Sequence, residues 1–208
     1  MRRVLVATRS AGKLRELAPL LSEAGVHAID LATAGIVEAP YEAAIESHET
    51  FEANALAKAR YFAGRSGLPT LADDSGLCVD ALGGRPGVRS KRWSGRLDLS
   101  GDALDAANNA MLASELSDLD AGRDARGAAY VCAMAYVDDE REVVRRGETR
   151  GEVLVEPRGA GGFGYDPYFW SVDLGRSFAE VTREEKARVS HRARALAAIL
   201  RALTISGA

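Results

Sequence analysis

Residues 3–25 of the chain, RVLVATRSAGKLRELAPLLSEAG, decide the fold class. They begin with a short apolar run over residues 3–7, which predicts a buried strand. Residues 12–24 predict a helix that ends at Gly25, because leucines recur there at helical spacing: Leu14, Leu17, Leu20 and Leu21. A strand that leads through a short turn into a helix is typical of an α/β protein.

The rest of the chain continues this mixture. Helical patterns cover residues 50–65 and 102–116, a capping box starts a short helix at Thr182, and Ser190 caps a last helix with an apolar stripe. Strand patterns cover residues 69–72, 77–82, 128–137, 142–146 and 151–155, with residues 165–170 as a candidate continuation. We therefore expect an α/β fold in which helices flank a long mixed β-sheet, arranged as two lobes with a cleft between them.

The composition excludes several classes of protein. With 47% hydrophobic and 27% charged residues among 208, the chain is neither disordered nor fibrous as a whole. The net charge of −3 argues against a protein that coats a nucleic acid polymer, because such binding needs a positive field. No apolar run approaches the roughly 18 residues of a membrane span, and the first ten residues lack the apolar core of a signal peptide. We expect a cytoplasmic protein with no membrane partner and with Cys78 and Cys132 as buried thiols.

The first candidate site is the turn Thr8-Arg9-Ser10-Ala11-Gly12-Lys13 between the first strand and the first helix. Such a junction presents backbone N–H groups and the positive end of the helix dipole, which together favour anions. The hydroxyls of Thr8 and Ser10 and the charge of Lys13 add to this. The segment is not a Walker A loop, because Leu14 follows Gly12-Lys13. It predicts a phosphate site, with an ordinary turn capped by Ser10 as the alternative.

The second candidate is the pair Asp73-Asp74, which follows an apolar run and precedes Ser75-Gly76. Two adjacent carboxylates at a strand end need solvent or a cation. Mg²⁺ prefers such oxygens and takes only one or two of them from protein when phosphates supply the rest. The pair predicts a magnesium site or a base that activates water, with a polar turn as the alternative. An upstream acidic stretch could add a metal ligand: Glu42, Glu46, Glu49 and Glu52.

The third candidate is the glycine-rich stretch 159–167, GAGGFGYDP. It matches GxGxxG formally, but no helix pattern follows, so we reject a dinucleotide fingerprint. Glycines let the backbone approach a flat ligand, and Phe163 or Tyr165 could stack on a base. The alternative is a glycine-rich turn with core aromatics.

The fourth candidate is Lys186 together with Ser190-His191-Arg192. These residues offer many hydrogen-bond donors, which suit phosphate or keto oxygens. Surface basic residues are the alternative. His27 and His48 are isolated in the sequence, so a Ser-His-Asp hydrolase has little support.

In combination, these segments resemble a known family. TRSAGKLREL, LADDSGL, ALGGRPGV, GGFGYDP and EEKARVSHRARAL are similar, in the same order, to the signatures of the Ham1-like (inosine triphosphatase) family of noncanonical purine nucleoside triphosphate pyrophosphatases. The resemblance implies Mg²⁺-dependent hydrolysis of ITP, dITP and XTP to the monophosphate and pyrophosphate. It also implies a homodimer and an elongated α/β fold, with residues 1–208 as a single two-lobed catalytic domain.

The resemblance also implies roles for particular residues. Thr8, Arg9, Ser10, Ala11, Gly12 and Lys13 would hold the phosphates, and Ser75 would contact the substrate. Asp74 would be the general base and a metal ligand. Phe163, Gly164, Tyr165 and Asp166 would frame the base, and Lys186, His191 and Arg192 would contact the nucleotide. Glu46 is the expected second metal ligand, with Glu49 and Glu52 as rivals.

Two positions depart from the family pattern. Ser10 stands where the family commonly has Asn, and its shorter reach weakens the phosphate contact or leaves it shared with Arg9. His48 replaces the usual glycine between Glu46 and Thr50, which is why the second metal ligand is hard to place.

The expected mechanism is attack of water on the α-phosphorus, with the water positioned or deprotonated by Asp74 and the leaving charge neutralised by Lys13. Donors such as His191 and Arg192 favour a purine with a 6-keto oxygen over adenine. Two other functions stay open: a nucleotide sensor without catalysis, and a phosphatase that acts on other nucleotides or sugar phosphates.

Overall fold

The computed structural model describes residues 2–117 and 126–205, and the chain divides into two compact units. Unit 1 takes the described residues within 1–74, 132–147 and 191–208, and unit 2 takes those within 75–131 and 148–190. The strands form one seven-stranded mixed sheet in the order β2-β1-β3-β4-β5-β6-β7. The three central strands each contribute residues to both units. The predicted α/β class with a mixed, helix-flanked sheet is confirmed.

Unit 1 opens with the predicted strand–turn–helix. Strand β1 (Arg2–Val6) leads into helix α1 (Ala11–Glu23) and then into β2 (Val26–Asp30). Both β2 and β3 (Thr70–Val79) pair in parallel with β1. The sequence pattern did not predict β2, because it is a short edge strand in which Ile29 alone is fully buried.

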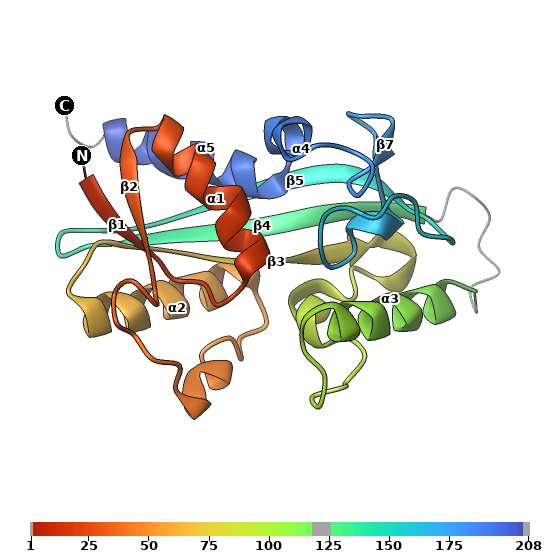
Figure 1. Cartoon of the computed structure of the whole chain (residues 1–208), viewed down its shortest axis with the longest axis horizontal. Helices are drawn as coiled ribbons and strands as arrows, with labels where there is room; N and C mark the ends of the chain where they lie inside the picture. Colours follow the sequence, from red (N-terminus) through yellow and green to blue (C-terminus); the bar gives the residue numbers. More distant parts are fainter. Residues whose placement is uncertain (1, 118–125, 206–208) are drawn as a thin grey trace. The chain divides into compact units, whose positions relative to one another are not determined.

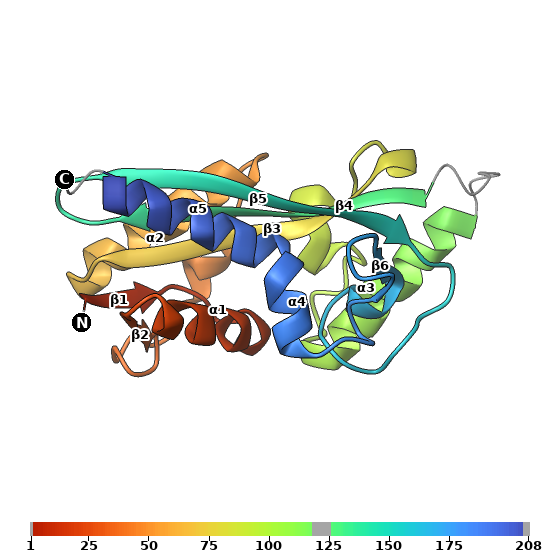
Figure 2. The ribbon, with the colours of Figure 1, turned by 90° about the horizontal axis from the view of Figure 1, so that it is seen from above.

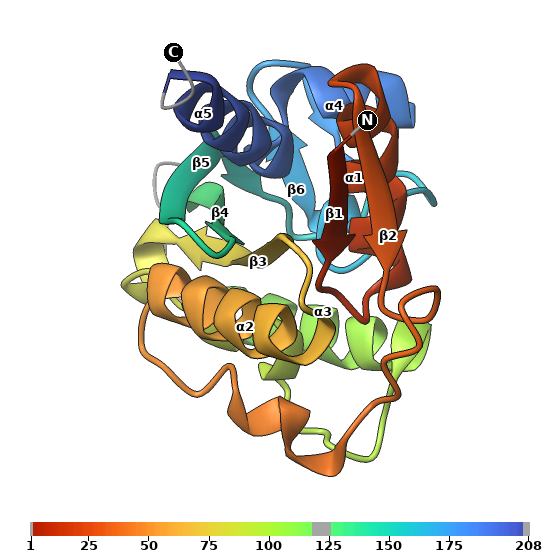
Figure 3. The same ribbon diagram turned by 90° about the vertical axis from the view of Figure 1, so that its left-hand side faces the viewer.

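Helices cover both faces of the sheet in unit 1. Helix α2 (Phe51–Ser66) lies on one face, and α1 and α5 (His191–Ile205) lie on the other (Figure 3). A short 3₁₀ turn, η1 (Pro40–Ala44), precedes α2, whose cap Thr50 accepts a hydrogen bond from the Ala53 N–H at 3.2 Å. The core between the sheet and the α1/α5 layer includes Val4, Val6, Leu17, Leu21, Leu71, Met134, Leu196 and Ile199.

Strands β4 (Gly127–Val137) and β5 (Glu142–Val153) are joined by a tight turn, in which the Asp138 N–H donates to the Arg141 carbonyl at 3.1 Å (Figure 2). The sequence predicted two short strands in place of β5, and this prediction is wrong. The residues between the two predicted strands are extended, and Gly147 among them lies directly against α5. A Cβ there would overlap the His191 carbonyl oxygen and the Ala195 nitrogen.

Strand β3 also differs from the prediction. It is one continuous strand of ten residues, not the two strands predicted over residues 69–72 and 77–82, and residues 80–82 form a 3₁₀ turn. The turn tendency of Asp-Ser-Gly is overridden because each carboxylate finds a partner inside the protein. The prediction of two buried thiols is correct for Cys132 but not for Cys78, which is half-buried. Cys78 alternates in β3 with the buried Leu77 and Val79 and therefore faces the less covered side.

Unit 2 contains the helices α3 (Gly101–Ser117, green in Figure 1) and α4 (Arg183–Val189) and the short strands β6 (Phe169–Ser171) and β7 (Arg176–Ser177). Its 3₁₀ turns are η2 (Asp80–Leu82), η3 (Gly87–Arg92) and η5 (Asp166–Tyr168). The core of unit 2 includes Leu77, Val79, Leu112, Tyr130, Tyr165, Phe169 and Phe178.

Two predictions for unit 2 have opposite outcomes. The capping box of α4 is confirmed: Thr182 Oγ1 accepts from the Glu185 N–H at 3.2 Å, and the Thr182 N–H donates to Glu185 Oε2 at 2.8 Å. The predicted strand over residues 165–170 is wrong in its first part. Pro167 favours the 3₁₀ turn η5, so β6 begins only at Phe169. Within the described residues, no helix has the length and apolar character that crossing a bilayer requires.

Candidate active site

The predicted phosphate turn lies between β1 and α1 in unit 1. Ser10 caps α1, because its Oγ accepts from the Lys13 N–H at 3.4 Å, and its own N–H donates to Thr8 Oγ1 at 3.1 Å. Ala11 and Gly12 form the first helical positions. The first amides of a helix have no carbonyl partner within that helix, so the turn presents donors and a positive dipole end together.

Arg9, which is among the residues expected to hold the phosphates, is paired with groups of the protein itself. Its guanidinium donates to both carboxylate oxygens of Glu42, at 3.0 and 2.9 Å, and to the Ile36 carbonyl at 2.9 Å. The same group lies over the Phe62 ring at 5.8 Å. These contacts tie the turn to the segment before α2, so Arg9 is engaged by the protein's own carboxylate.

The two adjacent aspartates of β3 point to opposite faces of the sheet, as successive strand residues do. Asp73 lies on the α1/α5 face, where its Oδ2 is 3.0 Å from Lys13 Nζ and accepts from Arg192 Nε at 3.2 Å. Asp74 lies on the α2 face, where its Oδ2 accepts from Asn54 Nδ2 at 2.9 Å. The strand therefore separates two carboxylates that are neighbours in the sequence.

The surroundings give the two carboxyls opposite protonation tendencies. Burial opposes the ionisation of Asp73, but Lys13 and Arg192 outweigh it and hold the pKa of Asp73 far below its usual range. For Asp74, burial raises the pKa, Glu46 raises it further, and Lys13 and Lys58 lower it only in part, so the pKa stays above its usual value. Asp73 is thus a fixed anion, and Asp74 is the better proton acceptor.

Arg192 connects Asp73 to α1. Its side chain is fully buried. Nη1 forms an ion pair with Glu16, and Nε forms an ion pair with Asp73. At least two of its three guanidinium nitrogens are therefore committed to carboxylates of unit 1. Arg192 and Lys13 therefore share the carboxylate of Asp73.

A second ion pair, partly buried, lies on the α2 side. Lys58, one turn after Asn54 in α2, donates to Glu46 Oε1. Burial lowers the pKa of Lys58, but Glu46 and Asp73 outweigh this and raise it above its usual value. The rivals of Glu46 as metal ligand lie elsewhere: Glu49 is exposed, and Glu52 forms a surface ion pair with Arg146 at 3.3 Å.

These residues form what we call the charged cluster: Lys13, Glu16, Glu46, Lys58, Asp73, Asp74 and Arg192. It holds four carboxylates against three cations, and it therefore has one negative charge in excess. Among the described residues, no three His, Cys, Asp or Glu side chains are arranged to hold a metal ion by themselves. A divalent cation that also binds phosphate needs only one or two carboxylates, so the pair Asp74 and Glu46 fits such an ion.

In unit 2, the predicted base-framing residues form a compact group. Asp166 is buried, and its Oδ2 accepts from the Phe163 N–H at 2.9 Å and from Lys186 Nζ at 2.6 Å. Lys186 Nζ also lies 5.0 Å from the centre of the Phe163 ring. Gly162 is required here, because its φ is +73° and a Cβ would overlap the Asp166 carboxylate.

The two aromatic candidates for base stacking differ in position. Tyr165 is buried in the core, and its hydroxyl donates to the Ser90 carbonyl at 2.7 Å. Phe163 is half-buried. The stacking prediction therefore narrows to Phe163, whereas Tyr165 anchors the loop.

Ser75, Ser190 and His191 lie, along the chain, where one unit ends and the other begins. Ser75 is half-buried in β3 within unit 2, directly after Asp74. Ser190 ends α4, and His191 is the buried first residue of α5. Thr149 Oγ1 donates to the Val189 carbonyl at 2.6 Å and fixes the end of α4 to β5.

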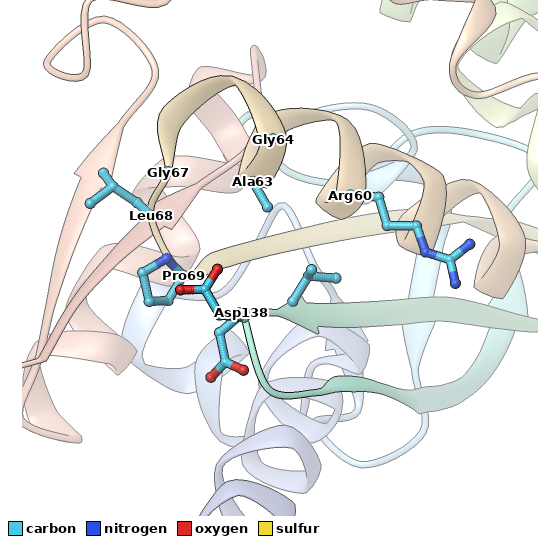
Figure 4. A pocket seen from close by; sticks show the side chains of 9 residues that line it. Arg60, Ala63, Gly64, Gly67, Leu68, Pro69 and Asp138 are labelled. Atoms are coloured by element: carbon cyan, nitrogen blue, oxygen red, sulfur yellow. The ribbon is translucent and has the colours of Figure 1, made fainter.

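A pocket of about 230 Å³ lies beside the C-terminal half of α2 (Figure 4). It is lined by residues of α2, of the segment that joins α2 to β3, and of the β4–β5 turn, among them Arg60, Gly64, Pro69 and Asp138. None of the predicted site residues lines it, so this pocket is separate from the candidate active site.

Sequence reasoning missed three polar residues of the charged cluster and its surroundings: Glu16, Asn54 and Lys58. Asn54 and Lys58 carry a usable signal, because they are four residues apart and lie on the side of α2 that also carries Phe51, Ala55 and Phe62. Polar residues on an apolar helical stripe indicate a buried polar partner. Glu16 lies three residues after Lys13 and shares its helical face.

Residues 4–202 match the model of the Ham1 family. The chain belongs to the Ham1 family. A dITP/XTP pyrophosphatase of Ralstonia nicotianae is 47% identical over 208 residues, covering 99% of this chain and 98% of the relative. A dITP/XTP pyrophosphatase of Mycobacterium tuberculosis is 50% identical over 201 residues, covering 97% and 95%.

Solved Ham1 structures share the fold. A HAM1 protein from Coxiella burnetii superposes with a TM-score of 0.81 at 34% identity, covering 98% of this chain and 99% of that one. A nucleoside-triphosphatase, or dITP/XTP pyrophosphatase, from Mycobacterium abscessus gives a TM-score of 0.71 at 48% identity, covering 95% and 98%. Membership of the Ham1 family therefore covers nearly the whole chain in sequence and in structure.

Proposed function

We propose that this Ham1 protein hydrolyses ITP, dITP and XTP to the nucleoside monophosphate and pyrophosphate. The observation that carries the proposal is the placement of two adjacent carboxylates on opposite faces of β3: Asp73 contacts the cations Lys13 and Arg192, and Asp74 contacts the neutral amide of Asn54. The names of the relatives, dITP/XTP pyrophosphatase, support the same reaction and its substrates.

The phosphate tail is assigned to the turn Thr8–Lys13. The first amides of α1 and the hydroxyls of Thr8 and Ser10 donate hydrogen bonds to phosphate oxygens, and Lys13 supplies the charge. Lys13 is held by Asp73 at 3.0 Å, so its ammonium is oriented before a substrate arrives. Arg9 takes a positioning role through Glu42 instead of a direct phosphate contact.

Asp74 and Glu46 would hold Mg²⁺, because they supply the carboxylates that a phosphate-bound ion needs and the charged cluster has one negative charge in excess. When bound, the ion would neutralise charge on the phosphate oxygens. Lys58 keeps Glu46 ionised: burial raises the pKa of Glu46, and Lys58 and Lys13 lower it below its usual value.

Asp74 positions the attacking water and takes its proton, while Asn54 fixes one oxygen of the Asp74 carboxylate. The water oxygen forms a bond to the α-phosphorus, and the bond from the α-phosphorus to the bridging oxygen breaks. The electron pair leaves with pyrophosphate, whose charge Lys13 and the N-terminus of α1 stabilise. Positioning and electrostatics supply most of the barrier reduction in this kind of reaction.

The purine base is assigned to Phe163, Gly164, Asp166, Lys186 and His191. Phe163 stacks on the base, and donors favour a 6-keto oxygen over the amino group of adenine, because that amino group leaves them unpaired. Arg192 contributes to this recognition less than the sequence predicted, because at least two of its nitrogens serve Glu16 and Asp73. Ser75 follows Asp74 in the strand and contacts the substrate.

By the same resemblance, we propose a homodimer in the cytoplasm. Light scattering with size-exclusion chromatography tests the dimer, with a monomeric mass as the contrary result.

The reaction is tested by its products. A phosphate-specific dye should detect no phosphate from ITP until inorganic pyrophosphatase is added, because attack at the α-phosphorus releases pyrophosphate. Direct release of phosphate would contradict this position of attack. A panel that includes ATP and GTP, with and without Mg²⁺, tests the base preference and the metal.

A further inference from the structure

Helix α3 forms hydrogen bonds with both backbone groups of Gly164, its N–H and its carbonyl. Its N–H donates to Asp105 Oδ2 at 2.7 Å, and its carbonyl accepts from Asn109 Nδ2 at 3.0 Å. Asp105 and Asn109 are four residues apart in α3, so they lie on the same face of that helix. The sequence motifs did not include either residue.

Together with two further hydrogen bonds, these bonds hold the backbone of residues 163–166, called segment 163–166 below. Asp166 holds the Phe163 N–H at 2.9 Å, and Tyr165 is anchored to Ser90 at 2.7 Å. Gly164 has a φ of +63°, and nothing lies near the position of a Cβ, so packing of a side chain cannot fix this residue. The hydrogen bonds from α3 to its backbone therefore fix the position of Gly164, since a glycine has no side chain that could pack.

We propose that Asp105 and Asn109 are positioning residues that set the base selectivity of the enzyme by holding the backbone of segment 163–166. The proposal rests on the proposed function, in which this segment frames the purine. Hydrogen-bond recognition requires groups within about 0.5 Å of their productive positions. A glycine-rich segment without these bonds must be ordered by the substrate, and this ordering weakens binding.

Asn108 provides a matched control on the same helix. It is buried, its Oδ1 accepts from the Ser94 N–H at 2.8 Å, and its Nδ2 donates to the Lys91 carbonyl at 3.1 Å. These two bonds connect α3 to the η3 region and not to segment 163–166. A substitution of Asn108 therefore reports what a purely structural loss in α3 does to the enzyme.

The experiment compares Asp105→Ala, Asn109→Ala, Asp105→Asn and Asn108→Ala with the wild-type full-length protein. We expect the first two to raise KM for ITP about tenfold, with kcat changed less than about threefold, since one partly buried hydrogen bond to the backbone is lost. The preference for ITP over ATP should fall as well, because the 6-keto oxygen distinguishes these two purines. Asp105→Asn should restore KM to within about threefold, because the amide oxygen can still accept from the Gly164 N–H. Asn108→Ala should lower Tm and leave KM and the preference unchanged.

Hydrogen exchange without nucleotide gives a second readout. Amides of segment 163–166 should exchange about tenfold faster in Asp105→Ala and Asn109→Ala, but not in Asn108→Ala. Unchanged exchange and KM in Asp105→Ala, or an equal rise of KM in Asn108→Ala, would overturn the inference while the wild type still cleaves ITP. A wild-type protein that releases no pyrophosphate from ITP would instead overturn the proposed function.

Discussion

In unit 1, the charged cluster is held by side chains of opposite charge, whereas in unit 2 segment 163–166 is held through its backbone. Lys13, Asp73 and Arg192 fix one another by ion pairs in the interior. The backbone of Gly164 is fixed by the side-chain amide of Asn109 and the carboxylate of Asp105. Removing a member of the first group leaves a buried charge uncompensated, whereas removing a member of the second loses one hydrogen bond. The two regions should therefore respond differently to substitution.

The largest expected effect is on turnover, at Asp74. Asp74→Asn removes the proposed proton acceptor but keeps the shape of the side chain, so kcat for ITP should fall by about 10³-fold or more. Folding should be preserved, because an amide oxygen at this position can still accept the hydrogen bond from Asn54 Nδ2. Steady-state kinetics and thermal unfolding measure the two quantities. Turnover within tenfold of the wild type would remove Asp74 from the mechanism.

At the neighbouring Asp73, the larger expected effect is on stability. Asp73→Asn leaves Lys13 and Arg192 without their shared anion, and the free energy of unfolding should fall by about 3–5 kcal/mol. Urea denaturation measures this loss, with the exposed Asp98→Asn as control. A loss below about 1 kcal/mol would show that the ion pairs of the cluster do not hold it together.

A smaller effect is expected from the backbone of unit 2. Gly162→Ala forces a side chain into a positive φ and against the Asp166 carboxylate, so stability should fall by about 1–3 kcal/mol. The control is Gly64→Ala, at a solvent-exposed position within α2, where a Cβ meets nothing within 4 Å. This control should stabilise the protein by about 0.5–1 kcal/mol. If both variants had the same stability, the conformation of residue 162 would not matter.

The smallest effect is a dependence on pH at Asp105. Burial raises the pKa of Asp105, and the bond from the Gly164 N–H offsets this only in part. Folding therefore favours its protonated form, and this contribution to stability is complete below the unfolded pKa of about 3.9 and is lost as pH rises through the folded value.

Asp105→Asn has no such group. The Tm of Asp105→Asn minus that of the wild type should therefore increase between about pH 3.5 and pH 7. Calorimetry at several pH values measures the difference. A difference that shrinks with rising pH would mean that the ionised carboxylate is stabilised by its surroundings.

The contrast also explains which parts of the molecule could be predicted. Thr182 caps a helix as predicted, and Lys13 lies where the strand–turn–helix pattern indicates, because these features depend on neighbours in the sequence. The continuity of β3 through Asp73 could not be predicted, because it depends on Arg192, 119 residues away. The places of Asn109 and Gly164 depend equally on a partner 55 residues distant.

The alternation of β3 has a consequence for how this protein can change in evolution. Asp73 meets its cations on one face of the sheet, and Asp74 meets Asn54 on the other. Insertion or deletion of a single residue after Leu71 would exchange the faces, leaving the proton acceptor among cations and the fixed anion beside an amide. This stretch is therefore closed to changes of length, whereas the turn Asp138–Arg141 can lengthen freely without disturbing either carboxylate.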